Sequence, residues 1–185
     1  DIDTIQVIKE YDVNIVYQDN LGYGDALIHG IKQCKTKYFC IFNADGSFNP
    51  AEINKMYEVL QAKKLDFIFA SRYQASSGSE DDTMITLVGN YIFTYIGKIF
   101  FRLNISVILY TFVIGKTEQA NILDLKQKDF SFCVELPIKA KKMRMELGCI
   151  NSYERMRLAG KKKVNAFKDG FLILKHMIKL FFMKL

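Results

Sequence analysis

The sequence predicts an α/β domain with a mostly parallel sheet, and three observations support this. Helical apolar spacing alternates with short apolar runs through the first 71 residues. The run at 38–42 is a continuous apolar strand, and residues 66–71 form a further short strand. The chain has 185 residues, half of them apolar and a quarter charged, which suits one core and is unlike a disordered chain. Alternating helices and strands imply βα units joined by right-handed crossovers.

Local signals predict each element in turn. Ile2, Ile5 and Ile8 recur at helical spacing, the NLGYG turn at 20–24 leads into a helix, and Pro50 suits a first helical turn. The expected elements are a helix from residue 2, a strand at 13–17, a helix at 25–34, a strand at 38–42, a helix at 50–63, a strand at 66–71, a helix at 85–103 and a C-terminal helix at 166–185.

Charge and cysteine content narrow the function classes. The four cysteines form no CxxC pair, and with two histidines there is no zinc-type cluster, so reduced thiols in a cytosolic setting fit best. The net charge is +6, but residues 139–168 hold ten Lys or Arg against Glu146 and Glu154, a local charge of +8. Such a field favours a phosphate-bearing ligand, an anionic membrane surface or nucleic acid.

Polar residues follow the two apolar strands where those strands end. Asn43 and Asp45 follow the strand at 38–42, and Arg72 and Tyr73 follow the next. In sheets of this class, ligands bind outside the carboxyl ends of the strands. Asp45 is therefore expected at a ligand-binding rim, although Asn-Ala-Asp-Gly is also ordinary turn chemistry, and the pattern alone leaves both interpretations open.

Three segments stand out in order along the chain: NADGSFNPAEI, ASRY and ERMRLAGKKKVNAF. Together they resemble the catalytic domain of family 2 glycosyltransferases, in the dolichyl-phosphate mannose synthase and polyprenyl-phosphate sugar transferase branch, and the similarity runs over nearly the whole chain. The resemblance implies a Rossmann-like nucleotide-sugar glycosyltransferase fold with a mixed, mainly parallel sheet. DIDTIQVIKEY is similar to the helix after the family's Asp-Asp-Gly-Ser turn, so the first strand and much of the base pocket are expected before residue 1.

The resemblance also implies a reaction. A sugar would pass from a nucleotide-diphosphate donor to a polyprenyl phosphate, with inversion, by direct displacement helped by Mg²⁺ or Mn²⁺. Asp45 would hold the metal with Asn43, which stands where the family has its first acid. Arg72, Arg157 and Lys163 would hold phosphates.

Four more residues complete the expected substrate-binding set. Ser47 and Tyr73 lie in the matching motifs. Gly22 and Gly24 are expected to let the backbone approach the donor, with a plain tight turn as the alternative.

Some residues depart from the family pattern or remain open. Val107 stands where relatives carry Asp, which together with Asn43 favours an alternative: a catalytically weak or inactive relative acting as a membrane-associated interaction module. The acids at 80–82 lie in a Ser- and Gly-rich loop that is either a mobile lid or simply solvated. VIGKT at 113–117 lacks the first glycine of a P-loop.

Two helices suggest membrane contact. In the helix at 85–103 apolar residues dominate around one narrow polar stripe, which is typical of either a buried core helix or a helix lying against lipid. In the C-terminal helix a Phe- and Leu-rich seam lies beside lysines, with His176 on the polar face, which suits an anionic membrane interface or, alternatively, a partner helix or dimer seam.

These patterns define the expected organisation. Residues 1–165 form the catalytic domain and 166–185 the interface helix, peripheral on the cytoplasmic face of a membrane. Nucleic acid is not an expected partner, because the basic loop lacks interleaved aromatic residues.

Overall fold

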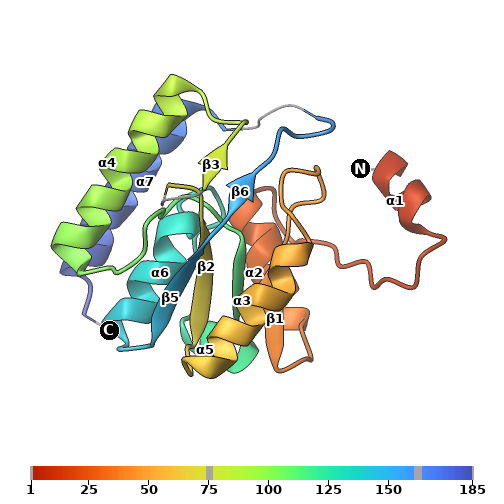
Figure 1. Ribbon diagram of the computed structural model, residues 1–185, viewed down its shortest axis with the longest axis horizontal. Helices are drawn as coiled ribbons and strands as arrows, with labels where there is room; N and C mark the ends of the chain where they lie inside the picture. The colour runs from red at the N-terminus through yellow and green to blue at the C-terminus, as the bar shows by residue number, and fades with distance from the viewer. Residues whose placement is uncertain (1, 74–76, 161–163, 185) are drawn as a thin grey trace.

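The computed structural model describes residues 2–73, 77–160 and 164–184. A four-stranded sheet lies at its centre with helices on both faces (Figure 1). The helices are α1 (Ile2–Ile8), α2 (Tyr23–Gln33), α3 (Ala51–Ala62), α4 (Met84–Phe101), α5 (Thr117–Ile122), α6 (Phe132–Lys142) and α7 (Ala166–Phe182). The strands are β1 (Tyr38–Ile41), β2 (Phe67–Ser71), β3 (Gly78–Ser79), β4 (Val113–Lys116), β5 (Leu147–Asn151) and β6 (Tyr153–Glu154).

The central sheet has the order β1-β4-β2-β5. β4 pairs antiparallel with both β1 and β2, whereas β2 and β5 pair in parallel. In this sheet β1, β2 and β5 run one way and β4 runs the other, which confirms the predicted mixed sheet. Because β4 lies between β1 and β2, only the β2–β5 pairing is parallel, so the sheet is less parallel than predicted. The carboxyl ends of β1, β2 and β5 share one edge, from which the parallel pair β3–β6 extends (Figure 1).

β2 is buried along its whole length because helices cover both faces of the sheet. Phe67 and Phe69 join the larger core, which includes side chains of α2, α6 and α7. Ile68 and Ala70 join a smaller core under α3. This two-sided burial explains the continuous apolar run in the sequence.

The predicted strand at 13–17 is wrong. In the described residues this segment has no secondary structure and forms part of an exposed arm that carries α1 away from the sheet (Figure 1). Val13, Val16 and Tyr17 are exposed. Apolar residues alone do not make a strand, because a strand also needs a hydrogen-bonding neighbour.

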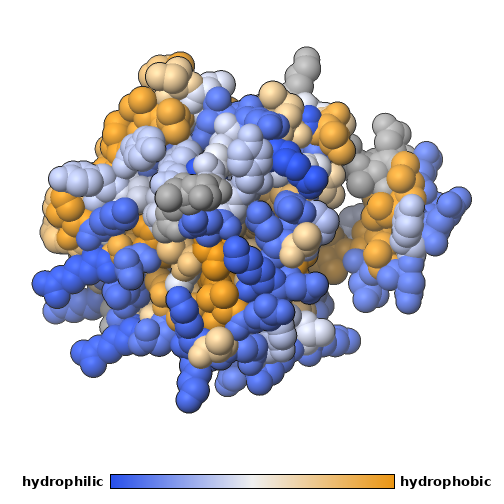
Figure 2. All heavy atoms as spheres, in the orientation of Figure 1, coloured by the Kyte–Doolittle hydropathy of each residue, from blue (hydrophilic) through white to orange (hydrophobic). Residues whose placement is uncertain are grey.

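α4 lies with its polar stripe inward and much of its apolar surface outward. Asn90 and Thr94 are buried, and Thr94 Oγ1 accepts a hydrogen bond from the backbone N–H of Ile108 (3.2 Å). The outward apolar side chains are at least half exposed, and Figure 2 shows them gathered over α4: Met84, Ile85, Val88, Tyr91, Ile92, Tyr95, Ile99 and Phe100. Among the described helices, only α4 is long and apolar enough to cross a membrane, a test that core helices also pass.

α7 packs against α4 and α6 and joins the main core through Ile173, Met177 and Leu180. Phe167, Phe171 and Ile178, which belong to the apolar seam expected at a membrane or a partner helix, are exposed. The placement of His176 on the polar face is wrong: it is buried on the side of α7 that faces the protein. Burial lowers the pKa of His176 below its ordinary value.

Candidate active site

Asp45 follows β1 and forms a tight turn. Its Oδ1 accepts hydrogen bonds from the backbone N–H (3.1 Å) and the hydroxyl (2.7 Å) of Ser47. Gly46 has φ +86°, a conformation that side-chain-bearing residues rarely adopt. Asp45 thus shapes the turn and also stands at the carboxyl edge of the sheet. Its role in binding a ligand stays a prediction.

A basic segment, residues 155–158, lies against this turn. The N–H of Leu158 donates to the carbonyl of Asp45 (2.8 Å), and the N–H of Arg155 donates to the carbonyl of Ser47 (3.0 Å). A cavity of about 440 Å³ adjoins the contact. It is lined by Gly46, Glu80, Tyr153, Arg155, Met156 and Leu158.

Arg157 is the predicted phosphate ligand that the structure brings to Asp45. Its Nη1 lies 3.8 Å from Asp45 Oδ2. Its Nη2 donates to Asp81 Oδ2 (2.9 Å), and its Nε lies 3.3 Å from both oxygens of Asp81. The hydrogen bonds to Asp81 are the main reason that the pKa of Arg157 is raised above its usual value. A fixed positive charge therefore stands beside the Asp45 carboxylate.

Arg72 is placed differently from the sequence expectation. Its side chain is 8% exposed, its Nη1 donates to Glu154, and its Nη2 lies 3.5 Å from Asp82 Oδ1. The guanidinium also stacks over Tyr110, 4.8 Å from the ring centroid. The group expected to face a phosphate instead faces two buried carboxylates, because the β3–β6 pair covers this end of β2.

Tyr73 connects the end of β2 with α4. Its ring stacks on Tyr91 (centroids 4.9 Å apart, 17° between planes), and its hydroxyl donates to Asp82. Burial raises the pKa of this hydroxyl. A role for Tyr73 in binding substrate stays a prediction.

Gly22 and Gly24 pack against the chain itself. A Cβ on Gly22 would lie 2.1 Å from the carbonyl oxygen of Lys128, and one on Gly24 would lie 2.1 Å from that of Gln127. In the structure the close approach that these glycines permit is to the backbone at 127–129. Their predicted approach to a donor stays a prediction.

The acids that hold the two arginines were missed by sequence reasoning. Asp81, Asp82 and Glu154 come together through the pairing of Gly78 with Tyr153 in the β3–β6 sheet. Arg72 and Glu154 lie 82 residues apart in the chain, and Arg157 and Asp81 lie 76 apart, so a local pattern does not reveal these pairings. In the structure the acids of this loop are bonded to other residues of the rim: Glu80 to Tyr153 and Met156, Asp81 to Arg157, and Asp82 to Tyr73. Whether the loop moves as a lid stays a prediction.

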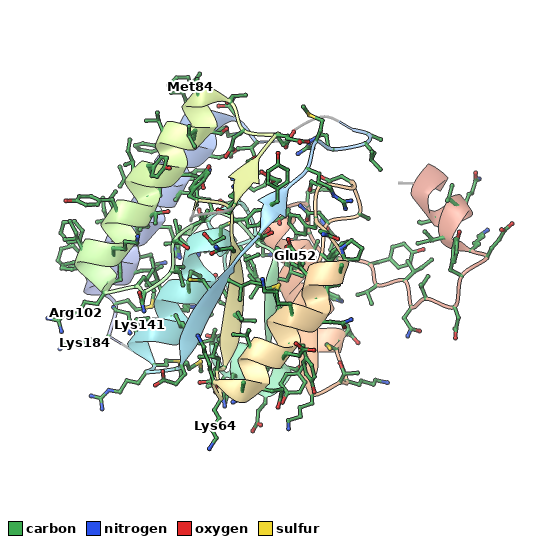
Figure 3. All side chains as sticks on the ribbon, viewed as in Figure 1. Glu52, Lys64, Met84, Arg102, Lys141 and Lys184 are labelled. Carbon is green, nitrogen blue, oxygen red and sulfur yellow. The ribbon has the colours of Figure 1, made fainter. Side chains whose placement is uncertain are left out.

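Glu52 marks the other side of this rim. It lies in the first turn of α3 and accepts a hydrogen bond from the hydroxyl of Ser152 (2.6 Å), between β5 and β6 (Figure 3).

Val107 contributes a buried apolar side chain to the core under α3. Lys163 lies outside the described residues.

The residues around Asp45 fit a metal ion carried by a substrate better than one held by the protein alone. In the described part of the chain, no three or more His, Cys, Asp or Glu side chains converge on a possible metal position. Asp45 offers one carboxylate, and half-buried Asn43 offers an amide oxygen just upstream. Mg²⁺ and similar hard ions accept one or two protein oxygens together with phosphate oxygens and water.

Comparison with known families decides the classification. Residues 2–120 match the model of Glycosyl transferase family 2. The chain belongs to glycosyltransferase family 2. The match includes β1, the Asp45 turn, β2 and α4.

Solved structures confirm the family 2 fold. A structure of glucosyl-3-phosphoglycerate synthase from Mycobacterium tuberculosis with Mn²⁺, uridine diphosphate and phosphoglyceric acid matches with a TM-score of 0.68 and 10% identity, over 97% of this chain and 58% of that one. A second structure of that enzyme matches with a TM-score of 0.66 and 9% identity, over 93% of this chain and 58% of that one. A third, with Mn²⁺, UDP-glucose and phosphoglyceric acid, matches with a TM-score of 0.62 and 10% identity, over 96% of this chain and 59% of that one. The chain thus spans about three-fifths of the length of these structures.

Proposed function

We propose that the protein transfers a sugar from a nucleotide-diphosphate donor to a polyprenyl phosphate. The observation that carries this proposal is the Asp45 carboxylate 3.8 Å from the Arg157 guanidinium, at the carboxyl edge of the sheet and beside a cavity. One group attracts a cation and the other an anion, which is the charge pattern of a metal diphosphate. Family 2 membership supports the same chemistry, and similar structures contain Mn²⁺ with uridine diphosphate.

The reaction is one displacement at the anomeric carbon. An acceptor oxygen forms the new bond to this carbon as the bond to the donor diphosphate breaks, and the electron pair leaves with the diphosphate, so the configuration inverts. Arg157 binds the departing charge. Asp45 Oδ2 and Asn43 would hold Mg²⁺ or Mn²⁺, which supplies further neutralisation of the leaving group when bound.

The acceptor proposal rests on the chemistry of the nucleophile. The predicted position of a catalytic base is occupied by Val107, a core residue. A phosphate monoester has a second pKa near 6, by analogy with phosphorylated side chains, so it is largely ionised at neutral pH and needs no base. The similar Mycobacterium structures contain phosphoglyceric acid, which also carries a phosphate, so the test must compare both acceptors.

A membrane location follows from the same proposal, because a polyprenyl chain resides in lipid. The outward apolar surfaces of α4 and α7 support peripheral binding to a membrane, which the proposal places at its cytoplasmic face. Cations flank this surface: Arg102, Lys141 and Lys184 are labelled at the same end of the α4–α7 pair in Figure 3. Lysines in α7 itself, Lys168, Lys175 and Lys179, are exposed, which suits anionic lipid.

A second candidate function is a catalytically weak or inactive relative that acts as an interaction module at the membrane. Asn43 and Val107 favour it, because each replaces an acid of the family pattern with a neutral residue. On this account the protein binds anionic vesicles but turns over no nucleotide sugar.

One experiment separates these accounts. The full-length protein is given a panel of nucleotide sugars with Mn²⁺ and either polyprenyl phosphate in vesicles or 3-phosphoglycerate. The proposal predicts transfer to the lipid phosphate that is lost in Asp45→Ala. Transfer only to phosphoglycerate would overturn the proposed acceptor, and vesicle binding without any turnover would favour the interaction module.

A further inference from the structure

An acidic strap, residues 80–82, joins β3 to α4 and runs beside the segment that carries Arg157. Glu80 accepts hydrogen bonds from the hydroxyl of Tyr153 (2.9 Å) and the backbone N–H of Met156 (3.0 Å). The bond from Met156 is the main reason that the pKa of Glu80 is lowered. The strap is thereby fixed to the chain immediately before Arg157.

Asp81, the middle residue of the strap, accepts hydrogen bonds from one edge of the Arg157 guanidinium. Nε and Nη2 both face its carboxylate, at 3.3 and 2.9 Å, whereas Nη1 points to Asp45, at 3.8 Å from Oδ2. Asp81 is 9% exposed and Arg157 is 24% exposed. The Nε–Nη2 edge of the guanidinium therefore binds Asp81, and Nη1, beside Asp45, carries N–H donors that remain for a ligand.

We propose that Asp81 is a positioning residue, which holds Arg157 so that its free edge faces the donor diphosphate beside Asp45. This inference rests on the proposed function of the Asp45–Arg157 site. Holding a long, flexible side chain in its binding orientation removes the entropy cost of ordering it when the ligand arrives. Asp81 acts through Arg157 and does not touch the ligand.

The opposite role for Asp81 makes an opposite prediction. If the carboxylate merely competed with phosphate for Arg157, removing its charge would tighten diphosphate binding. The geometry favours positioning, because Asp81 uses the Nε–Nη2 edge and leaves Nη1 toward Asp45. The Arg157 guanidinium can therefore bind Asp81 and a diphosphate at the same time.

A double-mutant cycle tests the inference. Inorganic pyrophosphate with Mg²⁺ is titrated calorimetrically into the full-length protein, its Asp81→Asn and Arg157→Ala variants, and the double variant. We expect Arg157→Ala and Asp81→Asn each to weaken binding, Asp81→Asn by about tenfold, and Asp81→Asn to add nothing once Arg157 is absent. Asp124→Asn, which removes an acid from the exposed pair with Lys126, is the matched control and should bind as wild type.

The outcomes distinguish the two levels of the proposal. Unchanged affinity in Arg157→Ala would overturn the proposed diphosphate site itself. Weakening in Arg157→Ala with unchanged or tighter binding in Asp81→Asn would overturn only the positioning role, as would an equal loss from Asp81→Asn in both backgrounds. If Asp81→Asn fails to fold, Asp81→Glu replaces it, because this change keeps the carboxylate but moves it by a methylene. The positioning role predicts that Asp81→Glu binds pyrophosphate more weakly than wild type, and wild-type affinity in this variant would overturn it.

Discussion

Replacing Arg72 by Met tests whether this residue holds the fold or a phosphate. The change keeps an apolar stem of similar length but leaves the carboxylates of Glu154 and Asp82, 9% and 8% exposed, without their shared cation. Breaking a buried ion pair by removing one partner costs roughly 3–5 kcal/mol. For a chain of this size, each kcal/mol lowers the melting temperature by about 2–4 °C, so a fall of roughly 6–20 °C is expected.

Thermal unfolding followed by circular dichroism measures this fall. Lys126→Met is the control, because the Lys126–Asp124 pair is short, 2.7 Å, but 67% and 72% exposed. Water screens such an exposed pair, so its loss should leave the melting temperature almost unchanged. The reasoning is refuted if Arg72→Met melts within about 2 °C of wild type while pyrophosphate binding is lost, since Arg72 would then be a ligand contact.

Three further predictions follow from burial and packing. Burial lowers the pKa of His176, so the folded protein binds this proton less readily than the unfolded chain and should lose stability as pH falls below about 6.5. In urea unfolding, the loss of unfolding free energy between pH 7.5 and pH 5.5 should be smaller in His176→Leu than in the wild type. Equal losses in the two proteins would contradict this. Gly24→Ala should destabilise the fold by roughly 1–3 kcal/mol in urea unfolding, because its Cβ would meet the backbone at Gln127, and an unchanged midpoint would be inconsistent with that contact. Ile92→Asp and Phe171→Asp, at side chains 53% and 69% exposed, should each weaken sedimentation with anionic vesicles by about tenfold without lowering the melting temperature; unchanged sedimentation would remove the membrane proposal.

Local sequence patterns located the elements that deliver Asp45. β1, α3 and β2 were predicted within a few residues, because each has its own apolar run or turn signal. β4 was not predicted as a strand, although it lies between β1 and β2 in the sheet. Its place depends on antiparallel pairing with residues 38–41 and 67–69, which no short pattern contains.

In the candidate site, too, local motifs were predictable from the sequence, whereas contacts between distant residues were not. The motif around Asp45 and the basic segment with Arg157 were both visible in the sequence, and the structure places them 3.8 Å apart. The burial of Arg72 was not visible, because its partner Glu154 lies 82 residues later and only the β3–β6 pairing brings it near. Likewise the inward direction of the α4 polar stripe depends on the loop that Thr94 bonds.

The Mn²⁺ dependence of sugar transfer by the full-length protein tests the central claim most directly. Asp45 is the only carboxylate in the Asn-Ala-Asp motif, so the proposed metal diphosphate depends on it. We predict saturable activation by Mn²⁺ in the wild type and a loss of about 100-fold or more in rate in Asp45→Ala, the scale expected when a leading electrostatic contact is removed. The same rate and the same Mn²⁺ dependence in both proteins would contradict the account.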